Sequence, residues 1–316
     1  MLDTSMIAAG IDVSKEKLDI ALHPGGQHLM VSYDAKGLME LSRFLAAHGV
    51  KRVGFESSGG YEGRLLAHLR GGPIEVGRFH AGQVKAFARS RLNRAKNDRR
   101  DALMIAAFTA SLERLPPLPD AAFDGFAEAL TYIEQLEERL VGVKTTLETT
   151  RDARLRAIHK RDIASLEARR ANEIARLTAQ IRTNDALARR LDLIDSVKGV
   201  GLRTALAILV RLPELGSMSR EEAAAMAGLA PYDNDSGKMA GKRRVAGGRS
   251  RLRKSLYMAA FSATQWNPDI KTFYTRLRKA GKEHLVAIIA SARKLIVTVN
   301  AIVKKGTPWT MKPAQI

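Results

Sequence analysis

The sequence predicts an α/β domain followed by an all-α region, and three observations lead to this fold class. Short β-prone runs alternate with helical patterns from residue 6 to about residue 115. A proline-rich stretch at 116–119 interrupts this pattern, because proline continues neither a helix nor a strand ladder. Beyond it, apolar residues recur every three or four positions, as in amphipathic helices. Three domains are therefore expected, over residues 1–115, 116–190 and 191–316.

Five runs in the first domain have the composition of strands. They cover residues 6–13, 18–22, 28–33, 52–56 and 74–79. The turns between the first three are too short for crossover helices, so these strands should form an antiparallel meander. Helical patterns near 38–47 and 61–69 separate the later strands, which predicts parallel additions to the same sheet. The expected result is a mixed sheet with helices outside it.

The second domain has the pattern of a long helical arm. Neither Gly nor Pro occurs between Gly142 and Gly199. The apolar residues Phe126, Leu130, Ile133, Leu136, Leu140, Val143 and Leu147 form a coiled-coil seam. A turn near Asp162 or Asn184 should fold the helix back, and the seam favours a homo-oligomer, a dimer or a tetramer. In the third domain, Gly and Pro return, which predicts several short helices joined by loops.

The composition indicates a polyanionic partner. The 316 residues include 52 Lys and Arg against 33 Asp and Glu, a formal net charge of +19. Such a charge favours DNA or RNA as the partner, although a merely basic soluble protein would share it. The chain has no cysteine, which excludes disulfides, thiolate zinc sites and cysteine nucleophiles.

No segment of the sequence is typical of a membrane protein. The N-terminal residues lack the basic and long apolar stretches of a secretory signal. The strongest late apolar run, 285–299, contains Arg293 and Lys294 and is too short and polar to cross a bilayer. A cytoplasmic protein without a membrane partner is expected.

Four carboxylates are candidates for a metal site. Asp98 and Asp101 lie three residues apart, which would place both on one helix face, and Asp12 and Glu56 fall at probable strand positions. Four acids gathered at strand ends repel one another, so such a cluster requires bound cations. Carboxylates are the ligands Mg²⁺ prefers, and two Mg²⁺ ions about 4 Å apart promote phosphoryl transfer. The alternative is that all four are ordinary surface or capping acids.

Two sets of basic residues are candidates for nucleic-acid binding. The first set surrounds the candidate metal site and includes Lys96, Arg99 and Arg100. The second lies between Ser236 and Pro268, where no acidic residue occurs. It consists of Lys238, Lys242, Arg243, Arg244, Arg249, Arg251, Arg253 and Lys254. Without acids nearby in the sequence, these side chains cannot form local ion pairs and should bind phosphates, unless they form a solvated basic face.

A third candidate contact to nucleic acid is Val197-Lys198-Gly199-Val200-Gly201. It matches a helix-hairpin-helix pattern, in which the two glycines, Gly199 and Gly201, expose backbone amides to a phosphate at a helix start. An ordinary tight turn between packed helices is the alternative.

The whole chain resembles a known family, the insertion-sequence transposases with a RuvC-like DEDD domain, also called RNA-guided bridge recombinases. The motifs that carry the resemblance occur in family order. They are Gly10-Ile11-Asp12-Val13-Ser14-Lys15, Phe55-Glu56, Lys96-Asn97-Asp98 with Asp101-Ala102, Gly228-Leu229-Ala230-Pro231, Ser236-Gly237 and Leu252-Arg253. One stretch departs from the family pattern, because Ala246 stands in place of a lysine and Arg249 in place of an asparagine.

The resemblance implies a ribonuclease H-like first domain with Mg²⁺ at the four acids. It also implies that Ser236 attacks donor and target DNA through a transient phosphoserine link, and that a structured guide RNA pairs with both. From the residues alone, Asp235-Ser236-Gly237 is better explained as an ordinary turn whose side chains cap the backbone, and Ser250 is a weaker nucleophile candidate. A DNA transposase or recombinase is thus expected. The alternatives are a metal-dependent nuclease or junction resolvase without a covalent intermediate, and a non-enzymatic nucleic-acid scaffold.

Overall fold

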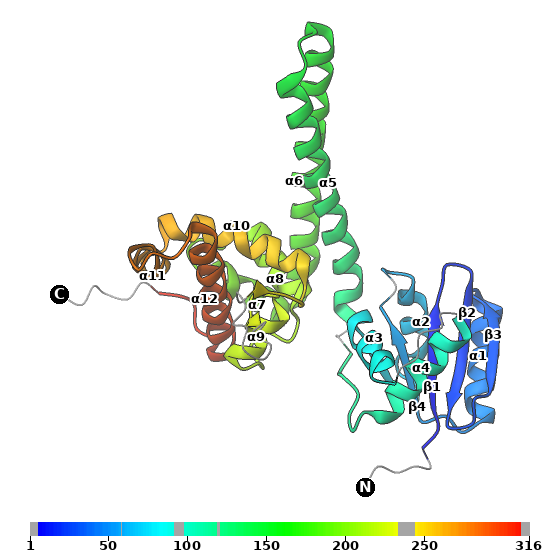
Figure 1. Cartoon of the computed structure of the whole chain (residues 1–316). Coiled ribbons are helices and arrows are strands. Elements are labelled where there is room, and N and C mark those ends of the chain that lie inside the picture. The colour runs from blue at the N-terminus through cyan, green and yellow to red at the C-terminus, as the bar shows by residue number, and fades with distance from the viewer. Residues whose placement is uncertain (1–5, 58, 92–97, 119–120, 233–243, 311–316) are drawn as a thin grey trace. The chain divides into compact units, whose positions relative to one another are not determined.

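The structure is a computed structural model that describes residues 6–57, 59–91, 98–118, 121–232 and 244–310. The chain divides into two compact units, Met1–Leu118 and Pro119–Ile316. The first unit is a sheet with helices, and the second is almost entirely helical (Figure 1). The division falls within the proline-rich stretch. The helical arm and the helices after it form a single unit by this division, whereas the sequence suggested two domains there.

The first unit contains a five-stranded mixed sheet in the order β3-β2-β1-β4-β5. Its strands are β1 (Ala8–Val13), β2 (Lys17–His23), β3 (His28–Ser32), β4 (Arg52–Glu56) and β5 (Glu75–Phe79). β1, β2 and β3 form an antiparallel meander, and β4 and β5 are added in parallel to β1. The expected mixed sheet is therefore confirmed. The lengths of the connections explain it, because short turns join only antiparallel neighbours, whereas parallel neighbours need a crossover.

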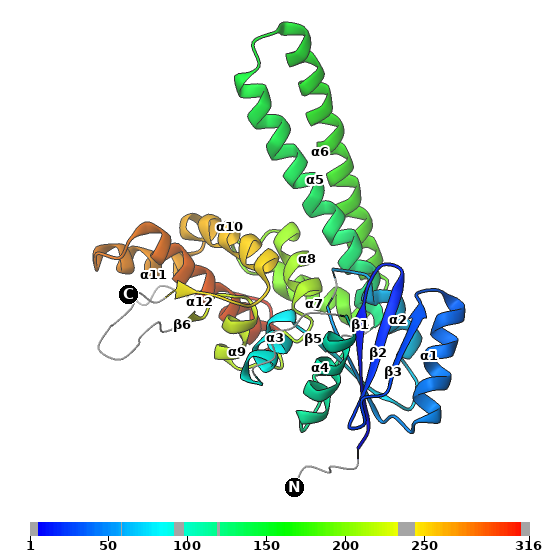
Figure 2. The same ribbon diagram turned by 45° about the vertical axis from the view of Figure 1, so that its right-hand side comes forward.

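Helices cover both faces of this sheet (Figure 2). Side chains that alternate with Gly10 and Gly54 along the strands, such as Ile11 and Phe55, are buried against α1 (Ala35–Ala47) and α2 (Glu62–Leu69). The opposite face packs against α4 (Asp98–Ser111), with α3 (Ala81–Ser90) beside it. Phe79 and Ile105 belong to this second, smaller core.

The second unit begins with a helical hairpin (Figure 1). After the short 3-10 turn η1 (Ala121–Phe123), α5 (Asp124–Thr149) and α6 (Ala153–Arg182) pack along each other. Of the two turn positions that the sequence suggested, Asp162 lies inside α6, whereas Asn184 does mark a helix break, because it caps α7 after the end of α6. The chain reverses at residues 150–152 instead, where the carboxylate of Asp152 accepts a hydrogen bond from Leu155 N at 2.8 Å and caps α6.

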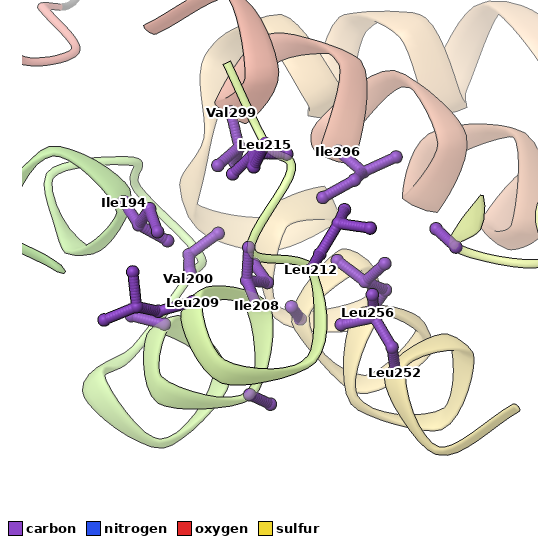
Figure 3. Close-up of a cluster of buried hydrophobic side chains, with 14 of the residues drawn as sticks. Ile194, Val200, Ile208, Leu209, Leu212, Leu215, Leu252, Leu256, Ile296 and Val299 are labelled. Carbon is purple, nitrogen blue, oxygen red and sulfur yellow. The ribbon is translucent and has the colours of Figure 1, made fainter. Parts of the chain in front are cut away.

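The six helices that the structure describes after the hairpin share one hydrophobic core, and the final helix of the chain lies within it (Figure 3). They are α7 (Asp185–Asp195), α8 (Leu202–Arg211), α9 (Arg220–Met226), α10 (Ser250–Trp266), α11 (Pro268–Lys279) and α12 (His284–Lys305). Ile208 and Leu212 of the α8 region, Leu256 of α10 and Ile296 of α12 meet in this core. Two short strands, β6 (Pro231–Tyr232) and β7 (Arg244–Val245), pair between α9 and α10.

Helix α12 is longer than the apolar run in the sequence suggested. Among the described residues it is the one helix long and apolar enough to cross a membrane, with 22 residues and a mean hydropathy of 1.8 over its best window. Half of that window is buried within the protein, where Leu295, Ile296 and Val299 pack against the other helices. This burial agrees with a core helix of the second unit.

Candidate active site

The first unit brings strand β1 and helix α4 into backbone contact. A Cβ atom on Gly10 would lie 2.1 Å from the carbonyl oxygen of Ala102 and 2.2 Å from the amide nitrogen of Ala106. Only glycine leaves room for a helix this close to the strand. Gly54 of β4, the register partner of Gly10, likewise lies beneath Thr109 of α4.

The direction of α4 follows from these contacts and from Arg52. The guanidinium of Arg52, two residues before Gly54, donates hydrogen bonds to the carbonyl oxygens of Leu112 at 2.7 Å and Glu113 at 3.1 Å. The end of α4 therefore lies at the start of β4, and α4 runs opposite to the parallel strands. Its first turn, which contains Asp101, lies at the carboxyl ends of β1 and β4.

Asp12 and Glu56 occupy those same strand ends. Ile11 pairs with Phe55 in the parallel register, so Asp12 and Glu56 are the next residues on adjacent strands. Each lies two residues beyond a glycine that touches α4, and therefore on the face that α4 covers. Backbone geometry thus brings two of the predicted ligands to one end of the sheet, beside the first turn of α4.

Asp101 of α4 is one of the charged groups that act on the carboxyl of Glu56. Burial raises the pKa of the Glu56 carboxyl, and the carboxylate of Asp101 raises it further. Lys85 of α3 and His80, which follows β5, act in the opposite direction. The Glu56 carboxyl therefore lies in a partly desolvated place between one acid and two basic groups.

The other parts of this predicted site are less completely described. Lys96 and Asn97 lie outside the described residues, and so does the side chain of Asp98, whose backbone begins α4. Arg99 and Arg100 are exposed in the first turn of α4. Among the described side chains, no group of three or more His, Asp or Glu is gathered closely enough to hold a metal ion.

Sequence reasoning placed Lys85 in the basic stretch around this site but did not assign His80 to it. His80 follows directly after β5, the strand next to β4, so its position at the carboxyl end of a parallel strand was the available signal. Its Nδ1 accepts a hydrogen bond from Gly82 N at 3.1 Å and caps α3. That cap fixes the start of α3, which carries Lys85 towards Glu56.

Asp19 is a further carboxylate on this face that the sequence analysis did not single out. It is buried and stands opposite Asp12 in the antiparallel register of β1 and β2. Its oxygens lie 3.1 Å from Lys17 Nζ and 3.1 Å from His28 Nε2. Lys17 balances its charge, and the contact with His28 joins β2 to β3.

A second candidate centre lies in the second unit, where the two halves of the late motif meet. Gly248 and Gly228 both have left-handed backbone conformations, with φ of 61° and 70°. A Cβ on Gly248 would lie 2.3 Å from Gly228 N, so the two backbones touch. Arg253 joins the same two loops by donating hydrogen bonds to the carbonyl oxygens of Gly228 and Gly247, each at 3.1 Å.

This contact holds both ends of the segment that contains Ser236. Pro231 pairs with Val245 and Tyr232 with Arg244 in the β6–β7 ribbon. Asp235, Ser236, Lys238, Lys242 and Arg243 lie outside the described residues. Ser250, the weaker nucleophile candidate, is exposed at the first position of α10.

Three members of the basic run after Ser236 form ion pairs with acids that are distant in the sequence. Arg249 forms two hydrogen bonds to Glu214, at 2.9 and 2.7 Å, and Arg251 lies 3.0 Å from Glu134 of α5. Lys254 lies 3.8 Å from Glu138. The partners come from distant parts of the chain, which a search for nearby acids does not detect. Arg244, in β7, is exposed.

The predicted phosphate-binding turn joins α7 to α8. Gly199 has φ of 98°, and a Cβ there would lie 2.5 Å from the Cβ of Ala263, so packing against α10 accounts for this glycine. Gly201 is exposed, has open space where a Cβ would stand, and forms the N-cap of α8 without a capping side chain. Of the two, Gly201 is the glycine that packing leaves unexplained.

Two family models match the chain, in the order of its two units. The model of the IS110 DEDD type, described as "Transposase", matches residues 9–159. The model described as "Transposase IS116/IS110/IS902 family" matches residues 191–275. The chain belongs to the IS110 family of transposases.

Curated relatives agree with this family assignment. Pilin gene-inverting proteins of Moraxella bovis and Moraxella lacunata are 27% and 26% identical to this transposase over 317 aligned residues, 95% of this chain and 96% of each relative. A 43.6 kDa protein of insertion element IS110 from Streptomyces coelicolor is 34% identical over 116 residues, 36% of this chain and 29% of its own length.

The family settles the general activity. An IS110-family transposase is an enzyme that cleaves and rejoins DNA, so its substrate is DNA. The DEDD domain implies a dependence on divalent metal ions, and the five-stranded mixed sheet is consistent with a ribonuclease H-like fold for that domain. Transposases of this family are typically soluble.

Proposed function

We propose that this transposase cuts and rejoins the strands of an insertion sequence with two chemical centres. One is a site for Mg²⁺, two ions in number, on Asp12, Glu56, Asp98 and Asp101, and the other is the hydroxyl of Ser236. The observation that carries the proposal is the meeting of β1, β4 and the first turn of α4, which brings Asp12, Glu56 and Asp101 to one end of the sheet.

The donor set fits a hard divalent cation in charge and in atom type. All four proposed ligands are carboxylates, the oxygen donors that Mg²⁺ prefers. Burial and the neighbouring Asp101 raise the pKa of Glu56, and a bound cation would offset both effects. When bound, the ions would supply stabilisation of the charge that develops on phosphate oxygens during strand transfer.

The basic residues around this end of the sheet are proposed to guide DNA to it. Arg99 and Arg100 are exposed in the first turn of α4, where the helix dipole also favours a phosphate. Lys96 precedes them in the sequence, and Lys85 acts on Glu56 from α3. These groups bind backbone phosphates without reading the sequence of the DNA.

Ser236 is proposed to be the nucleophile because of its place in the family motif and in the chain. It lies in the segment 233–243. The residues on either side of this segment pair as β6 and β7, next in the chain to the glycines of the Gly228–Gly248 contact. Its oxygen would bond to a DNA phosphorus while a deoxyribose oxygen leaves. A neighbouring side chain that acts as a general base would take the hydroxyl proton. Because a phosphodiester is kept in the protein link, the strands can later be rejoined.

Only part of the basic run after Ser236 is proposed to act mainly in phosphate binding. Lys238, Lys242, Arg243 and the exposed Arg244 are proposed to contact phosphates through their charge alone, whereas Arg249, Arg251, Arg253 and Lys254 also hold the fold together. Gly201 would add amides at the N-terminus of α8, as in a helix-hairpin-helix, with Gly199 keeping the turn against α10.

A structured guide RNA and a second copy of the chain complete the proposal. The charge of +19 and the family resemblance support RNA binding. Along the hairpin, no residue from 141 to 176 is buried, and the apolar side chains of Val141 and Leu155 are exposed. Leu130, Ile133, Leu136 and Leu140 of the predicted seam are already buried within the chain, so a coiled-coil contact with a partner's hairpin would cover the exposed distal side chains and form a dimer or a tetramer.

Covalent trapping tests the serine proposal directly. A suicide DNA substrate that carries the element ends should give a protein–DNA adduct on a denaturing gel. Ser236→Ala should abolish the adduct, whereas Ser250→Ala should retain it. Strand cleavage by Ser236→Ala at the wild-type rate would instead indicate the metal-dependent nuclease or resolvase.

The metal and RNA proposals need separate readouts. Asp12→Asn should remove Mg²⁺-dependent cleavage while leaving salt-dependent DNA binding intact. Asp34→Asn is the matched control, because Asp34 caps α1 on the other side of the sheet and asparagine also caps helices. Nuclease treatment of the purified protein should abolish target choice, and unchanged target choice would reject the guide RNA.

A further inference from the structure

A cavity of about 490 Å³ lies in the second unit, and none of the predicted site residues is among those that line it. Its lining comes from the start of α11, from α12 and from the residues after α12. Gly306 ends α12 in the left-handed conformation, with φ of 67°, and turns the chain back. The backbone N–H of Trp309 then donates a hydrogen bond to Ser196 Oγ at 2.9 Å, which holds this return segment in place.

A smaller hollow of about 260 Å³ adjoins the cavity and shares Asp269 and Lys294 with it. We call the two together the α11–α12 groove. Four cationic side chains line it against the single carboxylate of Asp269. They are Arg220, Lys294, Lys305 and Arg276.

Two of these cations are held in position by an aromatic ring. Lys294 Nζ lies 4.7 Å from the ring centroid of Phe273, and the Arg276 guanidinium lies 5.3 Å from it. Lys294 Nζ also lies 3.4 Å from the carbonyl oxygen of Asp269. The ammonium group of Lys294 is therefore fixed where the two hollows meet.

The wall of the groove is also rigid. Asn267 is buried, and its Oδ1 accepts hydrogen bonds from Asp269 N and Ile270 N, which caps α11. Its Nδ2 donates to the carbonyl oxygen of Lys198 at 2.8 Å, so the groove is joined to the turn that precedes α8. Because the side chain of Asn267 is hydrogen-bonded within the protein at both Oδ1 and Nδ2, this wall of the groove is formed before any ligand binds.

The contents of the groove match one chemical class. The half-buried indole of Trp309 supplies an aromatic surface, buried Leu295 and Ile302 supply apolar surface, and the cations supply partners for an anion. Proteins that bind single-stranded nucleic acid combine aromatic surfaces for bases with cations for phosphates. The cavity volume lies within the range of about 300–1,000 Å³ that is usual for ligand pockets.

We propose that the α11–α12 groove binds a short single-stranded segment of nucleic acid, with one base against Trp309. The phosphates of that segment contact Lys294, Arg220, Lys305 and Arg276. A duplex does not fit this description, because its bases are stacked inside and only a flipped or single-stranded base can enter a pocket. The groove thus takes a strand that is unpaired during recombination or in a partner RNA.

Tryptophan fluorescence tests the groove specifically. The chain has two tryptophans, and Trp266 is exposed, so Trp266→Phe leaves Trp309 as the sole reporter. The full chain would be titrated in EDTA with oligo(dT) and oligo(U) of about 12 nucleotides. Saturable quenching by either strand is expected, and the ratio of the two affinities identifies DNA or RNA as the natural source. A duplex of the same length should leave the fluorescence unchanged.

Variants separate the groove from the general basic surface. Lys294→Ala should weaken the quenching titration severalfold and reduce its salt dependence by about 0.7 in slope, since one phosphate contact is lost. Trp309→Ala, followed with a labelled strand, should weaken binding by roughly 5- to 150-fold. Lys271→Ala is the matched control, because Lys271 is exposed on α11 and does not line the groove.

Three results would overturn the proposal. They are equal quenching by duplex and single strand, equal quenching by polyglutamate, which would show an acidic-peptide site, and an unchanged titration in Lys294→Ala. Because binding is measured without metal and without cleavage, these results are independent of whether Ser236 and the carboxylates act as proposed.

Discussion

Gly10 of β1 and Ala102 of α4 are in backbone contact, with only 2.1 Å between the carbonyl oxygen of Ala102 and the place where a Cβ on Gly10 would stand. This contact determines how closely α4 lies on the sheet. It also fixes the position of Asp101, the residue before Ala102, relative to Asp12, which follows Gly10 by two positions.

Gly10→Ala should therefore damage both the fold and the reaction. The new methyl group pushes α4 from β1, and overpacking of this kind costs about 1–3 kcal/mol of unfolding free energy. A displacement of about 1 Å at a catalytic centre lowers rates by roughly 10²-fold. Urea unfolding and a strand-cleavage assay would measure the two effects.

Gly63→Ala is the matched control for this substitution. Gly63 lies in α2, with open space where its Cβ would stand, and alanine favours a helix by about 0.5–1 kcal/mol. Cleavage should be unchanged and stability equal or higher. Wild-type cleavage by Gly10→Ala would show that the position of α4 does not matter to the chemistry.

Glu56 should make the metal-free protein less stable as the pH rises. Burial raises the pKa of its carboxyl in the folded protein, so the folded state holds this proton more tightly than the unfolded state. The unfavourable contribution is absent below the unfolded pKa of about 4.3. The destabilisation caused by ionised Glu56 grows as the pH rises from there to the raised pKa of the folded protein, and it is constant at higher pH.

Glu56→Gln should consequently stabilise the first unit at pH 7 and have little effect near pH 4. Urea unfolding in EDTA at both pH values would measure this difference. An equal effect of the substitution at the two pH values would show that ionisation of Glu56 is not the cause.

Glu134 is expected to be the most important acid of the hairpin. Its side chain is 12% exposed and accepts hydrogen bonds from Arg211, at 2.9 and 2.6 Å, and from Arg251, at 3.0 Å. Glu134→Gln leaves these guanidinium groups without their charged partner and should cost about 1–3 kcal/mol in the second unit. Glu138→Gln should change stability by less than about 0.5 kcal/mol, because Glu138 is 68% exposed and 3.8 Å from Lys254. Similar losses for both variants would contradict this ranking.

The Gly228–Gly248 contact offers a matched pair of substitutions. Gly248→Ala combines a left-handed φ of 61° with a clash against the backbone of Gly228, and should cost about 2–4 kcal/mol. Gly247→Ala has a similar φ of 64° but open space around it, and should cost about 1–2 kcal/mol. Thermal unfolding would compare them, and covalent trapping should fail only in Gly248→Ala. Equal losses of stability in the two variants would show that the left-handed backbone conformation, and not the clash with Gly228, causes the loss.

The sheet could be predicted from the sequence because its connections are local. Turns of a few residues dictated the meander, and helix-length connections dictated the parallel strands. The turn of the hairpin could not be located, because Asp152, Asp162 and Asn184 are all plausible caps and no Gly or Pro lies nearby. Only the packing of α5 against α6 distinguishes among them.

Long-range pairing accounts for most of what the sequence did not reveal about the candidate sites. The partners of Arg249 and Arg251, Glu214 and Glu134, are 35 and 117 residues away in the chain. The contribution of His80 to the surroundings of Glu56 depends likewise on the parallel pairing of β4 with β5. A sequence shows such residues but not that they meet.

The clamp at Glu134 also affects how the hairpin can be engineered. Glu134 and its arginines lie near the base of the hairpin, and the last buried residue of α5 is Leu140. Removing or inserting whole helical turns in both helices beyond Leu140 would leave every one of these contacts intact. The distal hairpin is therefore a spacer whose length can be changed, or to which another protein can be fused, without redesigning the rest of the second unit.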